Sequence, residues 1–510
     1  MIKPSIQDAL VKCVFFLLLC ISPITLKAEL TAYTPAGVPA SKDFRVWVNG
    51  QEIFAGQAGN SQHGFYSFAT FDFTGNITVR VWSMRDIKWL DILPSAKKVG
   101  HKSIDDNTFE FDLSEPKMLT VLVNNDKNNA LHLLTSLPQS SPPRTNDANV
   151  LYYKAGKAYD VGVLDLTNNQ TLYIEGGAVL RGMVRVQGAT NVSILGRGMI
   201  DGSNNRASGS GLNNEPWRLI YLDHADNVRV EGITLFNSLH WTFHNFACKA
   251  LKINNIRILN WNYGSDGIDS CSCQDEVISD CFIRSNDDCL VFKALDFFHP
   301  SYYPNPRADK PNVKNVLVER CTLWNMDYGN VFEIGFEEQC EKVSDLTFRD
   351  CDVLMQDERG AIFSIHNGDY ATVENILWDN IRVENADLCA NSKLFDLAII
   401  YSMWGYDKNP FPETVRAKPK PNGAWDNLLS ELPDKKEFYA SNRGYIKNIT
   451  FQNIQILDGK FPYSVINGYD DNHLVENVAF ENITVQGRKV SGGKADLKLF
   501  TKFAENIQFK

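Results

Sequence analysis

A short motif recurs along the C-terminal part of the chain, and this repeat constrains the fold more than any other feature. Each copy joins two short runs of alternating apolar residues through a polar corner, commonly Asn or Asp. Clear copies occupy 227–233, 251–258, 277–283, 316–323, 346–353, 376–383, 449–456 and 478–485. Strands this short cannot bury their apolar faces alone, so successive copies must stack on one another.

Stacked copies of two strands each predict an all-β solenoid, a right-handed parallel β-helix whose coils lie about 4.8 Å apart. The corner Asn side chains can then donate hydrogen bonds to the next coil. Cys281, Cys321 and Cys351 fall at equivalent positions of three copies, so we expect a column of small buried apolar side chains. A β-propeller is the competing repeat fold, but it needs four strands per blade, and the two-strand copies favour a solenoid.

A different pattern precedes the repeat. Residues 29–136 contain short segments with a period of two, such as 44–48 and 118–123, separated by Asn-Gly and Gly-Asn turns. This pattern predicts a small β-sandwich domain. Residues 137–149 are rich in Pro, Ser and Asn and are interpreted as a linker, and 150–510 as the β-helix domain.

The N-terminus has the pattern of a signal peptide covering residues 1–28. Lys3 and Lys12 precede or begin an apolar run that ends near Ala28, a small residue suited to cleavage. We therefore expect a secreted or periplasmic protein that has no membrane association after cleavage, and a monomer. The net charge of −10 argues against nucleic acid or an anionic membrane as the main partner.

The cysteines indicate neither disulfides nor metal. The chain has 11 cysteines, and an odd number remains after the signal peptide is removed with Cys13 and Cys20. An odd number in a large chain with its own core does not suggest a disulfide framework. Cys271 and Cys273 lack a second Cys or His pair at metal-ligand spacing. We predict no cofactor and no metal site.

Three aspartates are the candidates for chemistry. Asp266 precedes the adjacent pair Asp287 and Asp288 by about one coil, so all three should meet on one outer face. Crowded carboxylates resist full ionisation, which places a protonated acid beside an ionised base, as glycoside hydrolysis requires. Solvated corner aspartates or a calcium site are the alternatives. Asp269 is a candidate fourth member of the cluster, but the preferred interpretation is that it satisfies backbone groups at the turn.

Several ordered motifs carry a family resemblance between about Leu172 and Gly335. They are Gly177 to Leu180, Gly196 to Gly202, Asn237 to Trp241, Ser265 to Asp269, and Asp287 with Asp288. Through them the chain resembles the polygalacturonase-type glycoside hydrolases of family 28, and more distantly the dextranase and isopullulanase family 49, which shares the β-helix. The resemblance implies that Asp287 is the general acid and that Asp266 and Asp288 activate water, with inversion.

Two departures from the family pattern concern the substrate. Asn330 stands where the family has the histidine of a Gly-His-Gly motif, and the coil at 360–366 has no Arg-Ile-Lys motif to bind a uronate carboxylate. We therefore expect a neutral or differently decorated sugar at the cleavage subsite. Asn330 is a predicted substrate contact. Glu333, His366 and Asp369 are predicted to replace the missing contacts, with stacking or turn roles as the alternative.

Two long insertions are candidates for the binding face, because irregular loops on a rigid repeat commonly line a site. They span 296–312 and 402–444, and the second carries Trp404, a predicted sugar contact. The alternative is that their aromatic residues pack onto the solenoid. Closure of one end of the cleft by 402–444 would favour cleavage from a chain end.

The expected partner is therefore a polysaccharide or oligosaccharide, and the leading hypothesis is an inverting hydrolase of an α-linked glycan. A dextranase-like hydrolase of neutral α-glycan is one alternative, favoured by the sandwich that precedes the helix. A polysaccharide lyase is another, although no basic residue is expected beside the aspartates to act as its base. A non-catalytic glycan-binding β-helix also remains, because the family histidine is missing.

Overall fold

The computed structural model describes residues 28–60, 64–205, 218–295, 310–356, 359–386, 392–400 and 436–510. The predicted signal peptide except Ala28, most of the 296–312 insertion, and Trp404 lie outside these residues. In the described part, strands dominate and helices are few and short, namely η1 (Ser95–Lys97), η2 (Lys127–Asn129), α2 (Lys436–Ser441) and η7 (Gly493–Ala495). No helix among them has the length and apolar character that crossing a membrane requires.

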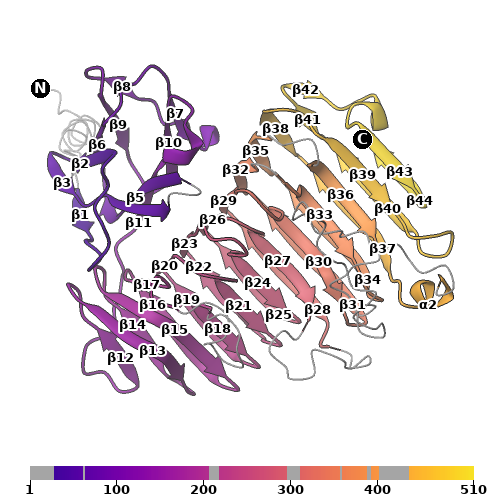
Figure 1. Ribbon diagram of the computed structural model, residues 1–510, viewed down its shortest axis with the longest axis horizontal. Helices are drawn as coiled ribbons and strands as arrows, with labels where there is room; N and C mark the ends of the chain where they lie inside the picture. The colour runs from indigo at the N-terminus through magenta and orange to yellow at the C-terminus, as the bar shows by residue number, and fades with distance from the viewer. Residues whose placement is uncertain are drawn as a thin grey trace, which may run out of the picture.

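Two packed sheets form the N-terminal part, coloured indigo to purple in Figure 1. The first sheet runs in the order β1 (Glu29–Ala32), β5 (Gly64–Thr74), β11 (Leu131–Ser136), β10 (Met118–Val123), β7 (Leu90–Leu93), with β4 (Gly56–Asn60) paired to β5. The second comprises β3 (Gln51–Ile53), β2 (Phe44–Val48), β6 (Ile77–Ser83), β9 (Thr108–Leu113) and β8 (Lys102–Ser103). Alternate side chains such as Val46, Val79, Phe111 and Val121 meet in a shared core.

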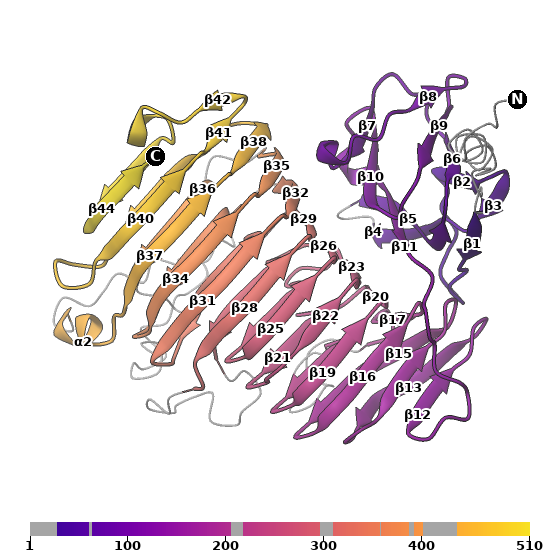
Figure 2. The ribbon, with the colours of Figure 1, turned by 180° about the vertical axis from the view of Figure 1, so that it is seen from behind.

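The rest of the chain winds into a parallel β-helix, and one long sheet lines its back (Figure 2). Its strands pair in parallel from coil to coil, so that each coil adds one strand. In order they are β12 (Val150–Tyr153), β14 (Thr171–Ile174), β16 (Thr190–Gly196), β19 (Asp226–Glu231), β22 (Lys252–Asn254), β25 (Gln274–Ser279), β28 (Val313–Glu319), β31 (Lys342–Arg349), β34 (Thr372–Asp379), β37 (Tyr445–Gln452), β40 (Val475–Glu481) and β44 (Ala504–Phe509).

The other sheet begins with β13 (Ala158–Leu166) and β15 (Val179–Gln187) and then divides into two parallel strips. Strip one comprises β17 (Met199–Asp201), β20 (Thr234–Phe236), β23 (Arg257–Leu259), β26 (Phe282–Ser285), β29 (Thr322–Asn325), β32 (Asp352–Gln356), β35 (Arg382–Asn385), β38 (Gln455–Asp458) and β41 (Thr484–Val485), which β42 (Arg488–Lys489) follows. Strip two comprises β18 (Ile220–Asp223), β21 (Phe243–Phe246), β24 (Ile268–Cys271), β27 (Leu290–Ala294), β30 (Phe332–Glu338), β33 (Ala361–Asn367), β36 (Lys393–Ile399), β39 (Tyr463–Asn467) and β43 (Leu499–Lys502).

Each full coil therefore carries three strands, namely the two predicted for each copy of the motif and a third that the motif does not include. The missed strands are those of strip two. Their outward positions carry polar residues such as His244, Asp269 and Lys293, which do not give the apolar alternation expected of a buried strand.

The corners of the coils form the predicted ladder. Asn448 donates to Asn375 at 3.3 Å, Asn477 donates to Asn448 at 3.1 Å, and Asn506 donates to Asn477 at 2.6 Å. All four have positive φ values between 52° and 59°, a conformation that Asn tolerates better than most residues. The recurrent Asn thus supplies both the backbone shape of the corner and a hydrogen bond between coils.

The cysteine column is also present. Cys281, Cys321 and Cys351 are fully buried in the helix core, and the amide of Cys321 contacts Cys351 Sγ at 3.4 Å. The eight cysteines in the described ranges are all free and buried. They act as small apolar side chains.

The sandwich packs against strip one of the helix. Phe68 meets Phe236 with ring centroids 5.6 Å apart, and Arg197 of the helix pairs with Asp72 of the sandwich at 2.8 Å. Farther along the strip, the backbone N–H of Ser95 donates to Glu384. The two units therefore share a contact that runs over several coils.

Candidate active site

The three aspartates lie in the turns that lead from strip one into strip two. Strand register pairs Ile268 of β24 with Leu290 of β27, and Leu290 with Phe332 of β30. Counting back two residues from each of these places Asp266, Asp288 and Asn330 at equivalent points of three consecutive coils. The structure therefore stacks Asp266 beside Asp288, as their spacing in the sequence predicts.

Hydrogen bonds to the backbone carbonyl of Asp287 hold this residue in place. Its carbonyl oxygen accepts hydrogen bonds from Ser285 Oγ at 2.8 Å and from Asn325 Nδ2 at 2.7 Å. Gly329 of the next coil, at φ 68°, approaches so closely that a Cβ there would lie 2.4 Å from Asp287 Oδ1. Only glycine leaves room for this carboxylate, which explains why Gly329 follows the family motif although the next residue does not.

The three carboxyl groups are electrostatically coupled. Burial, then the carboxylates of Asp269, Asp287 and Asp288, raise the pKa of Asp266 well above its usual value. Burial and the neighbouring carboxylates also raise the pKa of Asp288, and burial raises the pKa of Asp287 to about 6. The cluster thus retains a proton near neutral pH, which general acid catalysis requires.

A buried cation lies beside the cluster, contrary to the sequence-based expectation that no basic residue would be found there. Lys293 Nζ lies 3.7 Å from both Asp269 and Glu337 and 3.9 Å from the centre of the Trp241 ring. Its charge lowers the pKa of Asp266, Asp287 and Asp288 and so opposes the effect of burial.

Lys293 is unsuited to act as a base. Burial alone would lower its pKa, but the carboxylates of Glu337 and Asp269 outweigh that effect and raise it. The interpretation of Asp269 as a turn residue was wrong, because its carboxylate faces Lys293 and neither oxygen accepts a described backbone N–H. Burial raises the pKa of Asp269 to about 7, against the lowering effect of Lys293 and Arg218.

Asn330 contacts the cluster directly. Its backbone N–H and its Nδ2 both donate to Asp288 Oδ1, the second at 2.9 Å, and its Oδ1 accepts from the backbone N–H of Ala361 at 2.7 Å. An amide that donates without titrating therefore occupies the position where the family has an imidazole.

Glu333 and His366 bind one another. His366 Nδ1 lies 2.9 Å from Glu333 Oε1, and its Nε2 lies 2.9 Å from Asp396 Oδ2. Although burial alone would lower it, the two carboxylates raise the pKa of His366 to about 10, so the ring is an imidazolium. It stacks on Phe336 with centroids 4.5 Å apart. Both of its nitrogens donate to protein carboxylates.

Asp369 and Trp404 are the two remaining predicted sugar contacts. The carboxylate of Asp369 is buried and accepts the backbone N–H of Glu338 at 3.0 Å, which matches the structural alternative for this residue. Trp404 lies outside the described residues, so its role stays a prediction.

Two aromatic residues beside the aspartates were not selected from the sequence. Tyr263 and Tyr328 meet edge to face at 4.9 Å, and Arg359 lies 5.0 Å from the Tyr328 ring. Partial desolvation, then the carboxylate of Asp287, raise the pKa of Tyr263, a residue that is 67% exposed. These rings could contact a sugar bound over Asp287. The sequence could have indicated both rings, because Tyr263 lies in the turn of Asp266 and Tyr328 in the turn of Asn330.

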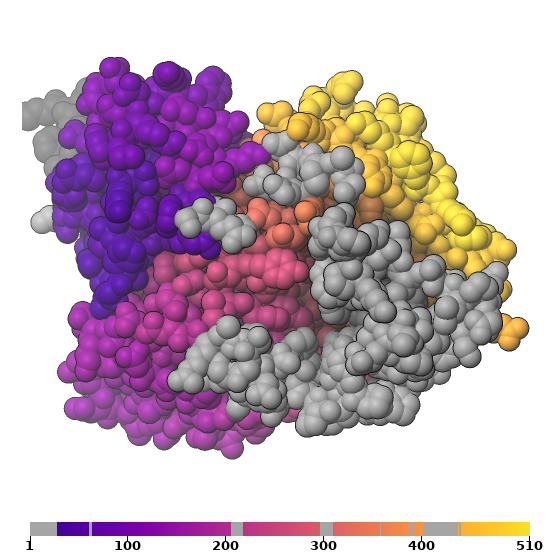
Figure 3. Space-filling view, viewed as in Figure 1, coloured from indigo at the N-terminus to yellow at the C-terminus, as the bar shows by residue number. Residues whose placement is uncertain are grey.

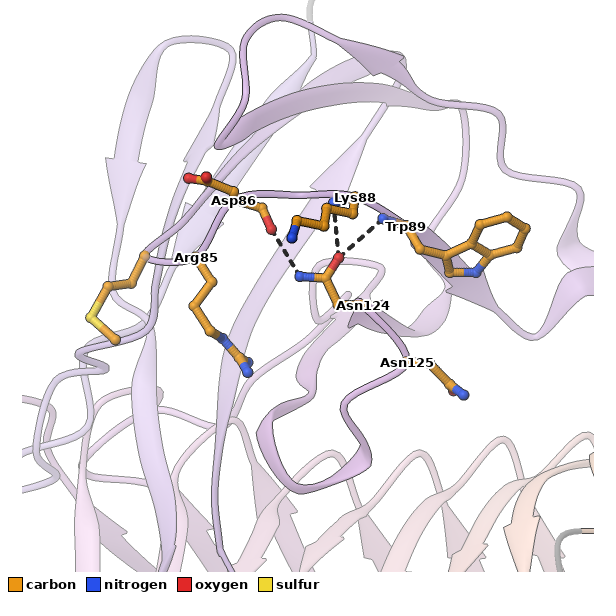
Figure 4. Close-up of a pocket in the computed structure, with 7 residues that line it drawn as sticks. Arg85, Asp86, Lys88, Trp89, Asn124 and Asn125 are labelled. Carbon is orange, nitrogen blue, oxygen red and sulfur yellow. Dashed lines mark hydrogen bonds between the residues drawn. The ribbon is translucent and has the colours of Figure 1, made fainter.

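A hollow lies on the sandwich (Figure 4). It has a volume of about 620 Å³ and is lined by the two loops around Trp89 and Asn124. Asn124 Oδ1 accepts from the backbone N–H groups of Lys88 and Trp89, and this ties the two loops together. None of the predicted site residues lines it. The aspartates belong instead to the middle coils, which the sandwich and the C-terminal coils flank in Figure 3.

The coil topology and the aspartate-bearing turns define a parallel β-helix protein with an acidic centre between two strips. Comparison with known proteins shows which family part of the chain is similar to. The family model "Glycosyl hydrolases family 28" matches residues 164–390, which include all three aspartates. This segment is therefore similar to that family, and the resemblance seen in the motifs is confirmed.

Individual relatives agree with this result. A "Probable exopolygalacturonase B" of Neosartorya fischeri is 26% identical over 39% of this chain and 45% of its own length. A "Probable polygalacturonase" of Vitis vinifera is 30% identical over 37% of this chain and 44% of its own length. The chain thus matches less than half the length of these curated relatives. Their class, glycoside hydrolase, is the predicted enzyme class.

Among solved structures, Dex49A from Penicillium minioluteum matches with a TM-score of 0.67 and 13% identity. The match covers 94% of this chain and 97% of that one. It therefore includes the sandwich as well as the solenoid. The predicted fold class, a right-handed parallel β-helix preceded by a small β-sandwich, is confirmed.

Proposed function

We propose that this protein is a secreted or periplasmic glycoside hydrolase that cleaves an α-linked polysaccharide or oligosaccharide with inversion. The observation that carries the proposal is the stacking of Asp266 beside Asp288 on adjacent coils, next to Asp287, with the pKa of all three raised. Asp287 donates its proton to the leaving oxygen, and Asp266 and Asp288 take a proton from the attacking water.

The hydrogen bonds support this division of roles, although burial raises the pKa of Asp288 as well as that of Asp287. Asp288 accepts two hydrogen bonds from Asn330, which favour its charged form, as a base requires. The carboxyl group of Asp287, whose pKa lies near 6, accepts the described hydrogen bond from the backbone N–H of Asp288 at 3.2 Å. Lys293 balances part of the negative charge. Asp287 and Asp288 can thus act as one acid and one base.

The substrate is proposed to differ from polygalacturonate at the cleavage subsite. His366 supplies a cation, but Glu333 and Asp396 both pair with it, and Lys293 is paired with Asp269 and Glu337. At these two positions a uronate carboxylate would therefore meet cations that are already neutralised, close to further carboxylates. A neutral α-glycan, as in a dextranase-like hydrolase, fits this charge distribution better.

Reducing-end release from purified protein tests the proposal. The panel comprises polygalacturonate, dextran and galactan oligosaccharides, with wild-type protein and Asp287→Asn side by side. We expect wild type to release reducing ends from a neutral substrate and Asp287→Asn to lose at least about a thousandfold in kcat, because the acid is removed. Near-normal activity of Asp287→Asn would remove the proposed acid.

The competing functions give different results in the same panel. A lyase would form an unsaturated product that absorbs in the ultraviolet. A glycan-binding protein would retain sugar without releasing reducing ends. Fractionation of the natural producer tests export, and intact protein found only in the cytoplasm would contradict it.

A further inference from the structure

The contact between sandwich and helix reaches both turns that carry the aspartates. Tyr66 of β5 and His132 of β11 are buried at this contact, with their rings edge to face at 5.3 Å. Tyr66 contacts the coil of Asp266, and His132 contacts the coil of Asp287 and Asp288.

The first connection begins at the Tyr66 hydroxyl, which donates to the carbonyl oxygen of Asn260 at 3.3 Å. Asn260 Nδ2 donates to Thr242 Oγ1, and Thr242 Oγ1 donates to the carbonyl oxygen of Asp266 at 2.6 Å. All of these side chains are buried. A residue of the sandwich is thus linked by hydrogen bonds through two helix residues to the backbone of the first aspartate.

The second connection runs through Arg284, the next-to-last residue of β26, which leads into the turn of Asp287. Its Nη1 donates to His132 Nε2 at 3.0 Å, and its guanidinium lies 3.8 Å from the ring centre of Tyr66 and 4.6 Å from that of Trp324. Its Nε also contacts Met326 Sδ at 3.4 Å, in the turn of the next coil. The guanidinium therefore joins the sandwich to two consecutive coils.

The protonation of His132 follows from these contacts. Burial and the charge of Arg284 lower its pKa well below the usual value, so the ring is neutral. Since a guanidinium only donates, Nε2 must accept, and Nδ1–H then donates to Thr120 Oγ1 at 2.8 Å. A single tautomer of His132 therefore fixes the orientation of Arg284.

A contact that served stability alone would not need this arrangement. Arg284 is 1% exposed, so its guanidinium is removed from water, which is costly. An apolar side chain would pack against Tyr66 and Trp324 at lower cost. The position of Arg284, immediately before Ser285 and the turn that it stabilises, offers a reason for keeping the charge.

We propose that the N-terminal sandwich is a positioning part of the catalytic centre, in which Tyr66 and His132 hold the two aspartate-bearing turns in register. This inference rests on the proposed hydrolase function. Tyr66 and His132 are positioning residues, because they act through Asn260 and Arg284 and do not touch substrate.

Three full-length variants test the proposal. His132→Phe keeps a ring but removes the acceptor for Arg284, and Tyr66→Phe removes only the hydroxyl. Asp72→Asn is the matched control, because it weakens the ion pair with Arg197 in the same contact away from the aspartate turns. His132→Gln, which restores an acceptor, is the rescue variant.

Hydrogen exchange measured by mass spectrometry is the readout that needs no substrate. We expect faster exchange in peptides spanning 262–267 in Tyr66→Phe and 285–290 in His132→Phe, and no change there in Asp72→Asn. On a cleaved glycan we expect kcat to fall about 10- to 100-fold at unchanged KM, because small displacements of reacting groups carry penalties of that size. His132→Gln should recover part of the loss.

Two outcomes would overturn the proposal. One is unchanged exchange in both turns, and the other is a fall in kcat no larger than that of Asp72→Asn at equal thermal stability. If wild-type protein hydrolyses no glycan, the proposed function fails, and the exchange comparison still decides whether the sandwich holds the turns.

Discussion

Replacement of Lys293 by Met removes the buried ammonium that lies 3.7 Å from both Asp269 and Glu337, and keeps an apolar chain beside Trp241. At an effective dielectric constant of about 20, unit charges about 4 Å apart interact by about 4 kcal/mol. The variant leaves two buried carboxylates uncompensated. We therefore expect the free energy of unfolding to fall by about 3–5 kcal/mol at pH 7.5.

The loss should be smaller at pH 5. The folded-state pKa of Lys293 is raised, so its charge contributes stability at every pH below its usual value, whereas Asp269, with its pKa near 7, carries the paired charge only towards neutral and higher pH. In Lys293→Met, the pKa of Asp269 rises further above 7, because a cation that lowers it is gone. At pH 5 Asp269 is protonated in both proteins, so the variant leaves less charge unpaired there than at pH 7.5.

Urea unfolding followed by tryptophan fluorescence at pH 5 and 7.5 measures both values. The same variant should move the alkaline limb of the kcat profile to higher pH, because Lys293 lowers the pKa of Asp287. Lys342→Met is the control, since Lys342 pairs with Glu374 at the surface and its loss should change neither value. An equal loss of stability at both pH values, or none, would refute the reasoning.

Four further predictions concern the buried acids, Asn330 and the corner ladder. Wild-type stability should fall as the pH rises from about 4 to 7, because an acid such as Asp269, with its pKa raised to about 7, binds its proton more tightly in the folded state than in the unfolded state. A urea midpoint that rises with pH over that range would contradict this. Asp287→Asn should melt at the same or a higher temperature than wild type at pH 7.5, since a buried charge is removed; a clearly lower melting temperature would argue against it. Asn330→Ala should lower kcat at least about tenfold with little change in KM, because Asp288 loses the Nδ2 hydrogen bond, and steady-state kinetics on a cleaved glycan measures this. Asn448→Ala should cost about 1–2 kcal/mol in urea unfolding, because it breaks the corner ladder at a positive φ; an unchanged midpoint would show that the ladder is dispensable.

The solenoid could be predicted from the sequence because its signals are local and repeat. Corner residues such as Asn448 and Asn477 recur at one position of the motif, and the apolar residues beside them alternate over only a few positions. Strand pairing from coil to coil then fixes which residues meet. The same logic places Asp266 beside Asp288, because equivalent points of adjacent coils stack.

Features that depend on contacts across faces could not be predicted. Lys293 follows an apolar run in the sequence, and only the alternation of β27 turns it outward to meet Asp269 of the previous coil. Strip two was missed for the same reason, since its outward residues are polar and yet lie buried in the acidic centre. The contact between His132 and Arg284 joins segments 152 residues apart, for which no local pattern exists.

The configuration of the first-formed product tests the central claim most directly. Proton NMR of a glycan during cleavage distinguishes the α and β anomers before mutarotation mixes them. The geometry of Asp266, Asp287 and Asp288 as one acid and a water-activating pair predicts that an α-linked substrate gives the β anomer first. The α anomer as first product would mean that one aspartate attacks the sugar itself, and would contradict the account.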